Sequence, residues 1–289
     1  MMVSLPVLIS VAFLTLLERK ILGLVGLRLG PSKVSFGGFF QPVADAVKLA
    51  NKSSNVLLNY SFFFYYLSGS SLIWMSLSLW AIFFSTPSPF QVKLSVLFFT
   101  VILSLNTLIL AFSGWSTLSK YTLIGSIRTI CQLVSYEACL YLCIFFFLSF
   151  FSIYSFGEMT EVGMHYMIVG FPSLIYFWVP TVLAELNRSP FDFSEGESEL
   201  VSGFNTDFSG FLFTLIFLSE YSMILFFCFL SCFLFFWNNL FLLFLCFFFI
   251  IWIRSVLPRY RFDKLMSVCW KFFIPFLTLL FLLQYVSML

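Results

Sequence analysis

Acidic residues concentrate in one stretch, residues 184–210, which reads AELNRSPFDFSEGESELVSGFNTDFSG. The stretch holds six of the chain's 13 acidic residues against a single base, Arg188. The six are Glu185, Asp192, Glu195, Glu197, Glu199 and Asp207. Long apolar runs flank the stretch on both sides. Solubility alone rarely requires so many acids in a loop between membrane-length segments, so we expect these carboxylates to have a chemical role.

Two further carboxylates, Glu137 and Glu220, interrupt runs that are otherwise apolar. At a rise of about 1.5 Å per residue, Glu137 lies roughly 13 Å along a helix from Arg128, and Glu220 roughly 18 Å from the start of its own run. Both positions fall near the middle of a bilayer, where a charge costs at least ~2.5–3.5 kcal/mol on insertion scales. Each of these acids therefore needs a reason to be there.

Glu185, Glu137 and Glu220 would stand on three successive helices at graded depths, as a ladder from the acidic loop into the membrane. Burial favours the neutral form of a carboxylic acid and lets it hold and release a proton near neutral pH. The alternative is that Glu137 pairs with a base from another helix and only fixes packing. The sequence has no Lys or Arg at a comparable depth, and the pattern therefore favours a proton path.

The composition is that of a membrane protein. Hydrophobic residues make up 61% of the chain and charged residues 10%, with a mean hydropathy of +1.03, whereas soluble domains carry about 25% charged residues. The net charge of +2 argues against a nucleic-acid partner. One histidine, and seven cysteines without a CxxC pair, provide too few ligands for a metal or cluster site. We expect no such site and interpret the cysteines as apolar packing residues.

Eight apolar segments approach or exceed the roughly 20 residues that span a bilayer. They run approximately over residues 2–26, 61–84, 94–113, 126–151, 164–184, 208–236, 238–253 and 265–286. We therefore expect an all-α polytopic membrane protein, with one transmembrane domain over residues 1–289, eight helices and an acidic inner loop at 185–207. The N-terminus lacks a basic region and a small-residue cleavage site, so we expect no removable signal.

Residues 39–51 are too short to span the membrane and are expected to form an amphipathic helix in its interface. The apolar residues recur at helical spacing, at Val43, Ala46, Val47 and Ala50. A plain surface helix is the alternative, but the preceding Phe39 and Phe40 favour the interfacial interpretation.

Basic residues are distributed unequally between the two sides of this arrangement. Of the 15 lysines and arginines, only Lys93 falls in a loop on one side. Loops rich in Lys and Arg stay on the inner side of a membrane. We therefore expect both termini on the outer side and the acidic loop on the inner side.

The charged triplet Glu18, Arg19 and Lys20 lies in the inner third of the first segment. Two interpretations stay open. The side chains snorkel to the interface, or they form a basic rim around a cavity that opens inward. The arginines of other inner loops that would join this rim are Arg28, Arg254, Arg259 and Arg261.

A set of motifs occurs along the chain in a fixed order. They are ERKILGLVGLRLGP (18–31), QPVADAVKL (41–49), SKYTLIGSIR (119–128), SYE (135–137), NRSPFDFSEGESELVSGFN (187–205), SEY (219–221) and RSVLPRYRFDKLM (254–266). Together they resemble subunit 1 of respiratory complex I, NADH:ubiquinone oxidoreductase, in its mitochondrially encoded form. The match runs from residue 18 to the last segment, and the acidic stretch is its most specific part.

The subunit of that family has eight transmembrane helices and lies where the membrane arm meets the peripheral arm. It forms much of the tunnel through which ubiquinone enters from the bilayer. The resemblance therefore implies that ubiquinone is the substrate and that this chain binds no cofactor, while FMN and iron–sulfur clusters belong to partner subunits. It implies partners in both arms and a place in the mitochondrial inner membrane, with the termini on the intermembrane-space side and the acidic loop on the matrix side.

The resemblance also implies roles for individual residues. The tunnel would be lined or braced by Arg19, Arg28, Asp45, Ala46, Phe217, Arg254, Arg259 and Arg261. The acidic path into the proton-pumping arm would consist of Asp192, Glu195, Glu197 and Glu199, with Glu185, Glu137 and Glu220. The chain departs from the family pattern at Gly26 and Leu29, which affects the expected shape of the tunnel rim and leaves the carboxylate path unchanged.

Three alternative functions can each be tested by a simple observation. An equivalent subunit of a membrane-bound hydrogenase would purify with nickel–iron and no flavin. A stand-alone proton-coupled transporter requires internal symmetry and interrupted helices, and neither is evident in the two halves of the chain. A purely structural anchor gains nothing from Glu137 and Glu220 at mid-membrane depth.

Overall fold

The computed structural model describes residues 4–52, 60–84, 94–151, 155–156, 172–193, 203–236 and 240–288. Every regular element within these ranges is helical, which confirms the predicted all-α class for this part of the chain. The α-helices are α1 (Ser4–Val25), α2 (Gln41–Ala50), α3 (Phe62–Phe84), α4 (Ser95–Ser116), α5 (Lys120–Phe151), α8 (Pro172–Glu185), α10 (Gly210–Phe236), α11 (Leu240–Val256), α12 (Phe262–Val268) and α13 (Ile274–Met288). Shorter turns are η1 (Phe36–Gly38), η2 (Gly203–Asn205) and the π-helical η3 (Cys269–Phe273), which joins α12 to α13.

Five helices in the described ranges are long and apolar enough to cross a membrane. They comprise Phe62–Ile82, Ser95–Ser116, Lys120–Ser149, Gly210–Phe235 and Phe262–Val286. Two shorter apolar helices, Ser173–Glu185 and Phe241–Val256, accompany them. α1 has 22 residues but contains the charged triplet Glu18, Arg19 and Lys20. These features are those of a polytopic membrane protein.

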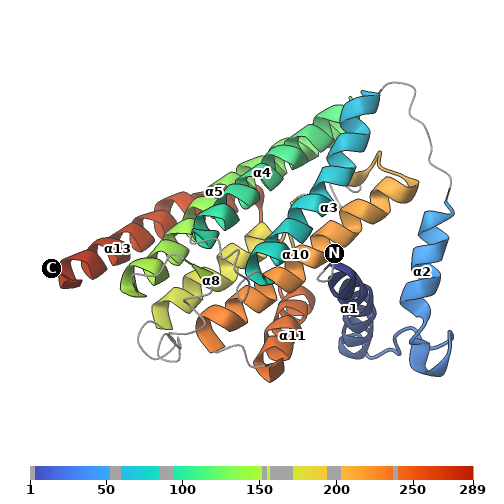
Figure 1. Ribbon diagram of the computed structural model, residues 1–289, viewed down its shortest axis with the longest axis horizontal. Helices are drawn as coiled ribbons and strands as arrows, with labels where there is room; N and C mark the ends of the chain where they lie inside the picture. The colour runs from blue at the N-terminus through green and yellow to red at the C-terminus, as the bar shows by residue number, and fades with distance from the viewer. Residues whose placement is uncertain are drawn as a thin grey trace.

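The helices form a tilted bundle in which α3, α4, α5 and α10 run side by side (Figure 1). α3 packs against both α4 and α10, and α5 packs against α4 and α8. α1 and α2 lie at one end of the view, where both contact α10, and α13 lies at the opposite end against α5. α10 therefore connects the N-terminal pair to the rest of the bundle.

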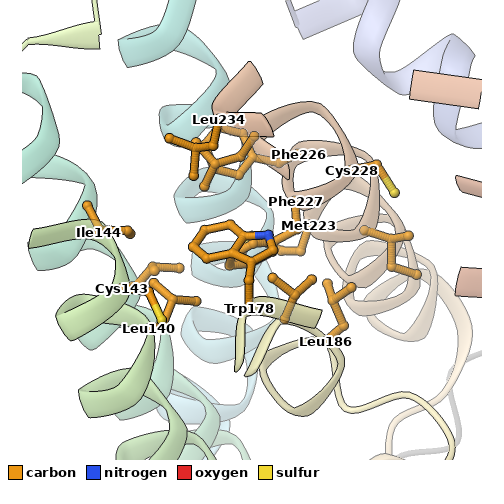
Figure 2. Close-up of a cluster of buried hydrophobic side chains, with 14 of the residues drawn as sticks. Leu140, Cys143, Ile144, Trp178, Leu186, Met223, Phe226, Phe227, Cys228 and Leu234 are labelled. Atoms are coloured by element: carbon orange, nitrogen blue, oxygen red, sulfur yellow. The ribbon is translucent and has the colours of Figure 1, made fainter. Parts of the chain in front are cut away.

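The centre of the packing is Trp178 of α8, which is 2% exposed. Figure 2 shows its indole between side chains of α5 and α10. The neighbours labelled there are Leu140, Cys143, Ile144, Leu186, Met223, Phe226, Phe227, Cys228 and Leu234. Because lipid tails are as apolar as these side chains, such helices associate through close van der Waals packing more than through the hydrophobic effect. Cys143 and Cys228 act here as small packing residues.

Small residues allow the helices to approach closely at the end of the bundle near the α4–α5 turn. A Cβ atom added to Gly114 of α4 would overlap the Ser126 side chain of α5. A Cβ added to Gly125 of α5 would lie 2.9 Å from the backbone of Gly203 in η2. The η2 turn, which comes before α10 in the chain, is thus held against α5 by backbone proximity, and this contact sets where the acidic stretch rejoins the bundle.

Replacing Gly114 by Ala is expected to destabilise the protein, because the new methyl group must displace α5. Overpacking of this kind costs typically ~1–3 kcal/mol. The temperature of half-inactivation of the assembled protein in membranes measures the effect. Gly69→Ala is the matched control, since its Cβ would meet only the flexible tip of Leu212, at 3.0 Å. Equal stability of the two variants would contradict the proposed close contact.

Candidate functional site

Glu18 of α1 is buried in a cluster of polar side chains from four segments. Arg254 of α11 forms an ion pair with its Oε1 atom, and the Nη1 atom of Arg188 lies 3.7 Å from the same oxygen. The Tyr221 hydroxyl of α10 donates a hydrogen bond of 2.6 Å to the other oxygen, Oε2. We call these four residues the Glu18 cluster. It joins α1, α10, α11 and the loop after α8.

Arg188 also packs on Tyr221, with its guanidinium carbon 4.6 Å from the ring centroid. Such a cation–π contact is stronger where water is excluded. Burial lowers the pKa of the Arg188 guanidinium, but Tyr221 and Glu18 outweigh this effect and the pKa lies above its usual value. Arg188 therefore remains a cation at any physiological pH.

The backbone at the end of α8 explains how Arg188 reaches the cluster. The Asn187 amide donates to the Ala184 carbonyl, and the Arg188 amide donates back to the Leu183 carbonyl. Asn187 adopts a left-handed conformation with φ of 49°, which asparagine tolerates better than most residues. This pattern is the Schellman motif that ends many helices. It reverses the chain directly after Glu185 and fixes the backbone from which Arg188 extends.

Glu185 and Glu220 line a common cavity of about 50 Å³, which we call the carboxylate cavity. Asn106, Asn187, Arg188 and Ser219 add further polar groups to its wall. A site needs roughly 10–15 Å³ and several polar partners to hold one water molecule. The carboxylate cavity therefore has the size and the lining to hold several waters between α8 and α10.

Glu137 lies behind Glu185, across the contact between α5 and α8. Each of the two side chains is 6% exposed, and a charge on Glu137 would repel a charge on Glu185. Neither Oε1 of Glu137 nor Oε2 of Glu185 has a hydrogen-bond partner among the residues that the structure describes. Two buried carboxyls that repel each other when charged disfavour simultaneous ionisation.

Gln132 of α5 holds the end of α8 in place. Its Nε2 atom donates to the carbonyls of Ala184 and Phe191, both at 2.8 Å. The side chain is fully buried and lies on α5 a little more than one turn before Glu137. It thereby holds the start of the acidic stretch against α5, the helix that carries Glu137. The sequence analysis did not identify Gln132, because one amide in an apolar helix carries no distinctive pattern.

The residues expected to line the tunnel fall into two groups. Arg19 forms an ion pair of 2.7 Å with Asp45 of α2, and the adjacent Ala46 is exposed. Phe217 of α10 packs on Tyr221 with ring centroids 4.5 Å apart. The first group of expected tunnel residues thus comes from α1, α2 and α10. Arg28 lies exposed beyond the end of α1.

The last loop places its arginines at separate positions. Arg254 belongs to the Glu18 cluster, whereas Arg259 pairs with Asp192 at 3.3 Å. Arg261 pairs with Asp263 at 3.0 Å on the exposed surface. Arg259 and Arg261 line a polar pocket of about 660 Å³ together with Arg128, Phe193, Tyr260, Phe262 and Asp263. Glu195, Glu197 and Glu199 lie outside the described residues, so their places in the acidic path stay predictions.

The residues of the charged triplet of α1 lie in different surroundings. Glu18 points into the Glu18 cluster, while Arg19 turns to Asp45 and is about half exposed. The sequence predicted these residues at a basic rim or at the interface. It gave no sign that Glu18 is buried among arginines. Tyr221 was visible only as part of the SEY motif, and Arg188 only as the single base of the acidic stretch.

Comparison with known proteins decides the family. The sequence model of the NADH dehydrogenase family matches residues 1–285. The chain belongs to the NADH dehydrogenase family. Among its relatives are proteins named NADH-ubiquinone oxidoreductase chain 1, which confirms the resemblance inferred from the motifs. That of Aedes aegypti is 43% identical over 93% of this chain and 88% of its own length. That of Artemia franciscana is 42% identical over 98% of this chain and 95% of its own length, and that of Locusta migratoria 39% over 98% and 92%.

Replacing Gln132 by Leu is expected to lower the stability of this family member, because two buried carbonyls lose their donor. Each buried polar group left without a partner costs about 1–3 kcal/mol. Thermal inactivation in native membranes measures the loss. Thr278→Val serves as the control, since Thr278 is exposed and its hydroxyl bonds only the nearby Pro275 carbonyl. A Gln132→Leu variant as stable as the control would contradict the assigned bonds.

Proposed function

We propose that this chain is the membrane subunit of NADH:ubiquinone oxidoreductase that forms part of the ubiquinone access tunnel and couples quinone reduction to proton translocation. The observation that carries the proposal is the grouping of two buried carboxyls, those of Glu137 and Glu185, with the half-buried carboxyl of Glu220, which shares the carboxylate cavity with Glu185. The family and the names of the relatives favour this function over a hydrogenase subunit or a stand-alone transporter.

Protons would move along the carboxyls one at a time. A proton from the acidic stretch reaches Glu185 and passes through water in the carboxylate cavity to Glu220, or across the α5–α8 contact to Glu137. Each transfer leaves a carboxylate behind and a carboxylic acid ahead, so net charge does not accumulate in the membrane. Repulsion between Glu137 and Glu185 favours a single shared proton, which makes the pair suited to passing a proton onward. Glu195, Glu197 and Glu199, with Asp192, would supply the acidic stretch.

The quinone side of the proposal rests on α1, α2 and α10. α2 exposes apolar side chains, including Val43 and Val47, each 55% exposed. These suit the membrane interface that the sequence predicted for this helix. Arg19 ties α2 to α1 through Asp45, and Phe217 presents an aromatic face from α10 beside it. Ubiquinone would pass between these helices, with Ala46 leaving room and the inner arginines Arg28, Arg254, Arg259 and Arg261 bracing the inner end.

Electrons would come from elsewhere in the assembly. In the proposal, FMN and iron–sulfur clusters are held by partner subunits of the peripheral arm, and this chain contributes binding, orientation and proton paths. The chain would lie in the mitochondrial inner membrane with eight transmembrane helices. The unequal distribution of Lys and Arg supports termini on the intermembrane-space side and an acidic loop on the matrix side.

Glu137→Gln and Glu220→Gln are expected to preserve assembly and to lower the number of protons pumped per electron. Glutamine keeps the size and the polar amide but holds no transferable proton. The measurement combines NADH oxidation with proton uptake in sealed vesicles that contain the whole complex. Asp263→Asn, an exposed acid on the same inner face, is the control. Wild-type proton stoichiometry in both glutamine variants would overturn the proton-path assignment.

The Arg19–Asp45 pair offers a separate test of the tunnel mouth. Arg19→Asp is expected to raise the KM for a long-chain quinone about twofold to fivefold, as partly exposed ion pairs contribute ~0.2–1 kcal/mol. The double exchange Arg19→Asp with Asp45→Arg restores the attraction and should restore the KM. A short-chain quinone, which needs less of the tunnel, is the comparison substrate. Equal KM values for all three proteins would exclude a role of this pair at the tunnel mouth.

A further inference from the structure

Arg188 lines two separate cavities. One is the carboxylate cavity, where Arg188 shares the wall with Glu185 and Glu220. The other is a smaller space of about 10 Å³, which Arg188 lines together with Glu18 and Arg254. We call this second space the Glu18 cavity. Among the described residues, Arg188 is the ionisable side chain common to both.

We propose that Arg188 is a positioning residue that links Glu18, next to the proposed quinone tunnel, to the carboxylate cavity, by shifting its guanidinium toward whichever side carries the greater negative charge. The proposal rests on the proposed function and adds to it a connection between the tunnel side and the proton path.

The Arg188 guanidinium is shared between two carboxylates and is not bound tightly to Glu18. Its Nη1 atom lies 3.7 Å from Glu18, which exceeds the usual length of a hydrogen bond. Arg254 forms the closer pair with Glu18, so the Glu18 charge is balanced without full engagement of Arg188. Glu220 also attracts the same guanidinium. The two carboxylates thus compete for one cation.

Tyr221 provides the surface on which the shift takes place. The ring lies beneath the guanidinium, and a planar cation can slide across an aromatic face while it keeps a favourable contact. The hydroxyl of the same ring holds Glu18 through the 2.6 Å hydrogen bond. Glu220 precedes Tyr221 directly in α10, so a displacement of the ring and a change at Glu220 are mechanically connected.

The backbone of Arg188 is fixed while its side chain is long, which suits a local shift. The Schellman turn anchors the amide to Leu183, and Gln132 anchors both sides of the turn through Ala184 and Phe191. Movement is therefore confined to the side chain. The charged and titratable groups that surround it are Glu18 of α1, Glu185 of α8, Glu220 and Tyr221 of α10 and Arg254 of α11.

The test uses the assembled complex in sealed vesicles, with NADH oxidation and proton uptake measured together across a range of pH. Arg188→Lys keeps the positive charge but loses the planar fork, and is expected to lower the proton-to-electron ratio. In a Glu18→Gln background the same change should have a much smaller effect, because the competing carboxylate is already gone. Lys264→Gln removes an exposed positive charge from the same inner face and is the control.

The pumping ratios of these variants distinguish a failure of the Arg188 link from a failure of the proposed proton path. Strong non-additivity between Glu18→Gln and Arg188→Lys in the pumping ratio supports the link, since residues that act together are not additive. Additive effects overturn it. If Glu220→Gln loses pumping while Arg188→Lys pumps normally, the link is wrong and the proposed function stands. If Glu137→Gln and Glu220→Gln both pump normally as well, the link and the proposed function both fail.

Tyr221→Phe keeps the test decisive where an Arg188 variant does not assemble. It retains the ring beneath the guanidinium and removes only the hydroxyl that orients Glu18. A lowered proton-to-electron ratio with a shifted pH profile supports the link, because a purely structural role would change stability and leave the profile in place. A wild-type ratio and profile overturn it.

Discussion

A carboxylate can remain charged inside a membrane only if the protein supplies the opposite charge, and Glu18 satisfies this requirement through side chains from three other segments. Arg254 and Arg188 provide positive charge on one oxygen, and Tyr221 donates a hydrogen bond to the other. An uncompensated charge at such depth is costly. The helices that carry these groups therefore cannot separate without exposing one of them, and the positions of α1, α10 and α11 follow from that constraint.

The buried acids of the chain divide into two kinds by this criterion. Glu18 lies beside cations and has both oxygens engaged by neighbouring side chains. Glu137 and Glu185 repel each other when both are charged, and each has an oxygen without a hydrogen-bond partner in the described part of the chain. Their environment favours exchange of a proton over a permanent ion pair. Among the described residues, Arg188 is the ionisable side chain that lines both the Glu18 cavity and the carboxylate cavity, so it is in contact with both environments.

Length and hydropathy were enough to predict the helical class, because the bilayer imposes a simple demand on segment length, whereas the depths expected for Glu137 and Glu220 stay predictions. They placed the start of the fourth segment at residue 126, whereas α5 begins at Lys120. Hydropathy detects the part of a helix that meets lipid, and a helix continues into a polar loop when its backbone bonds are satisfied. The Glu18–Arg254 contact joins residues 236 positions apart, and no local pattern reports such a pairing. Glu185 and Glu137 were identified by type and depth, but their proximity depends on the side-by-side packing of α5 and α8.

The wide separation of Glu18 and Arg254 along the chain bears on how the protein is made. α1 is synthesised before α11. The closest cation to Glu18, Arg254 of α11, is therefore made only after most of the other helices. During that interval the first helix carries a charge that the finished bundle would neutralise. Of the two arginines around Glu18, Arg188 is thus made first, and the closer partner, Arg254, follows only with α11.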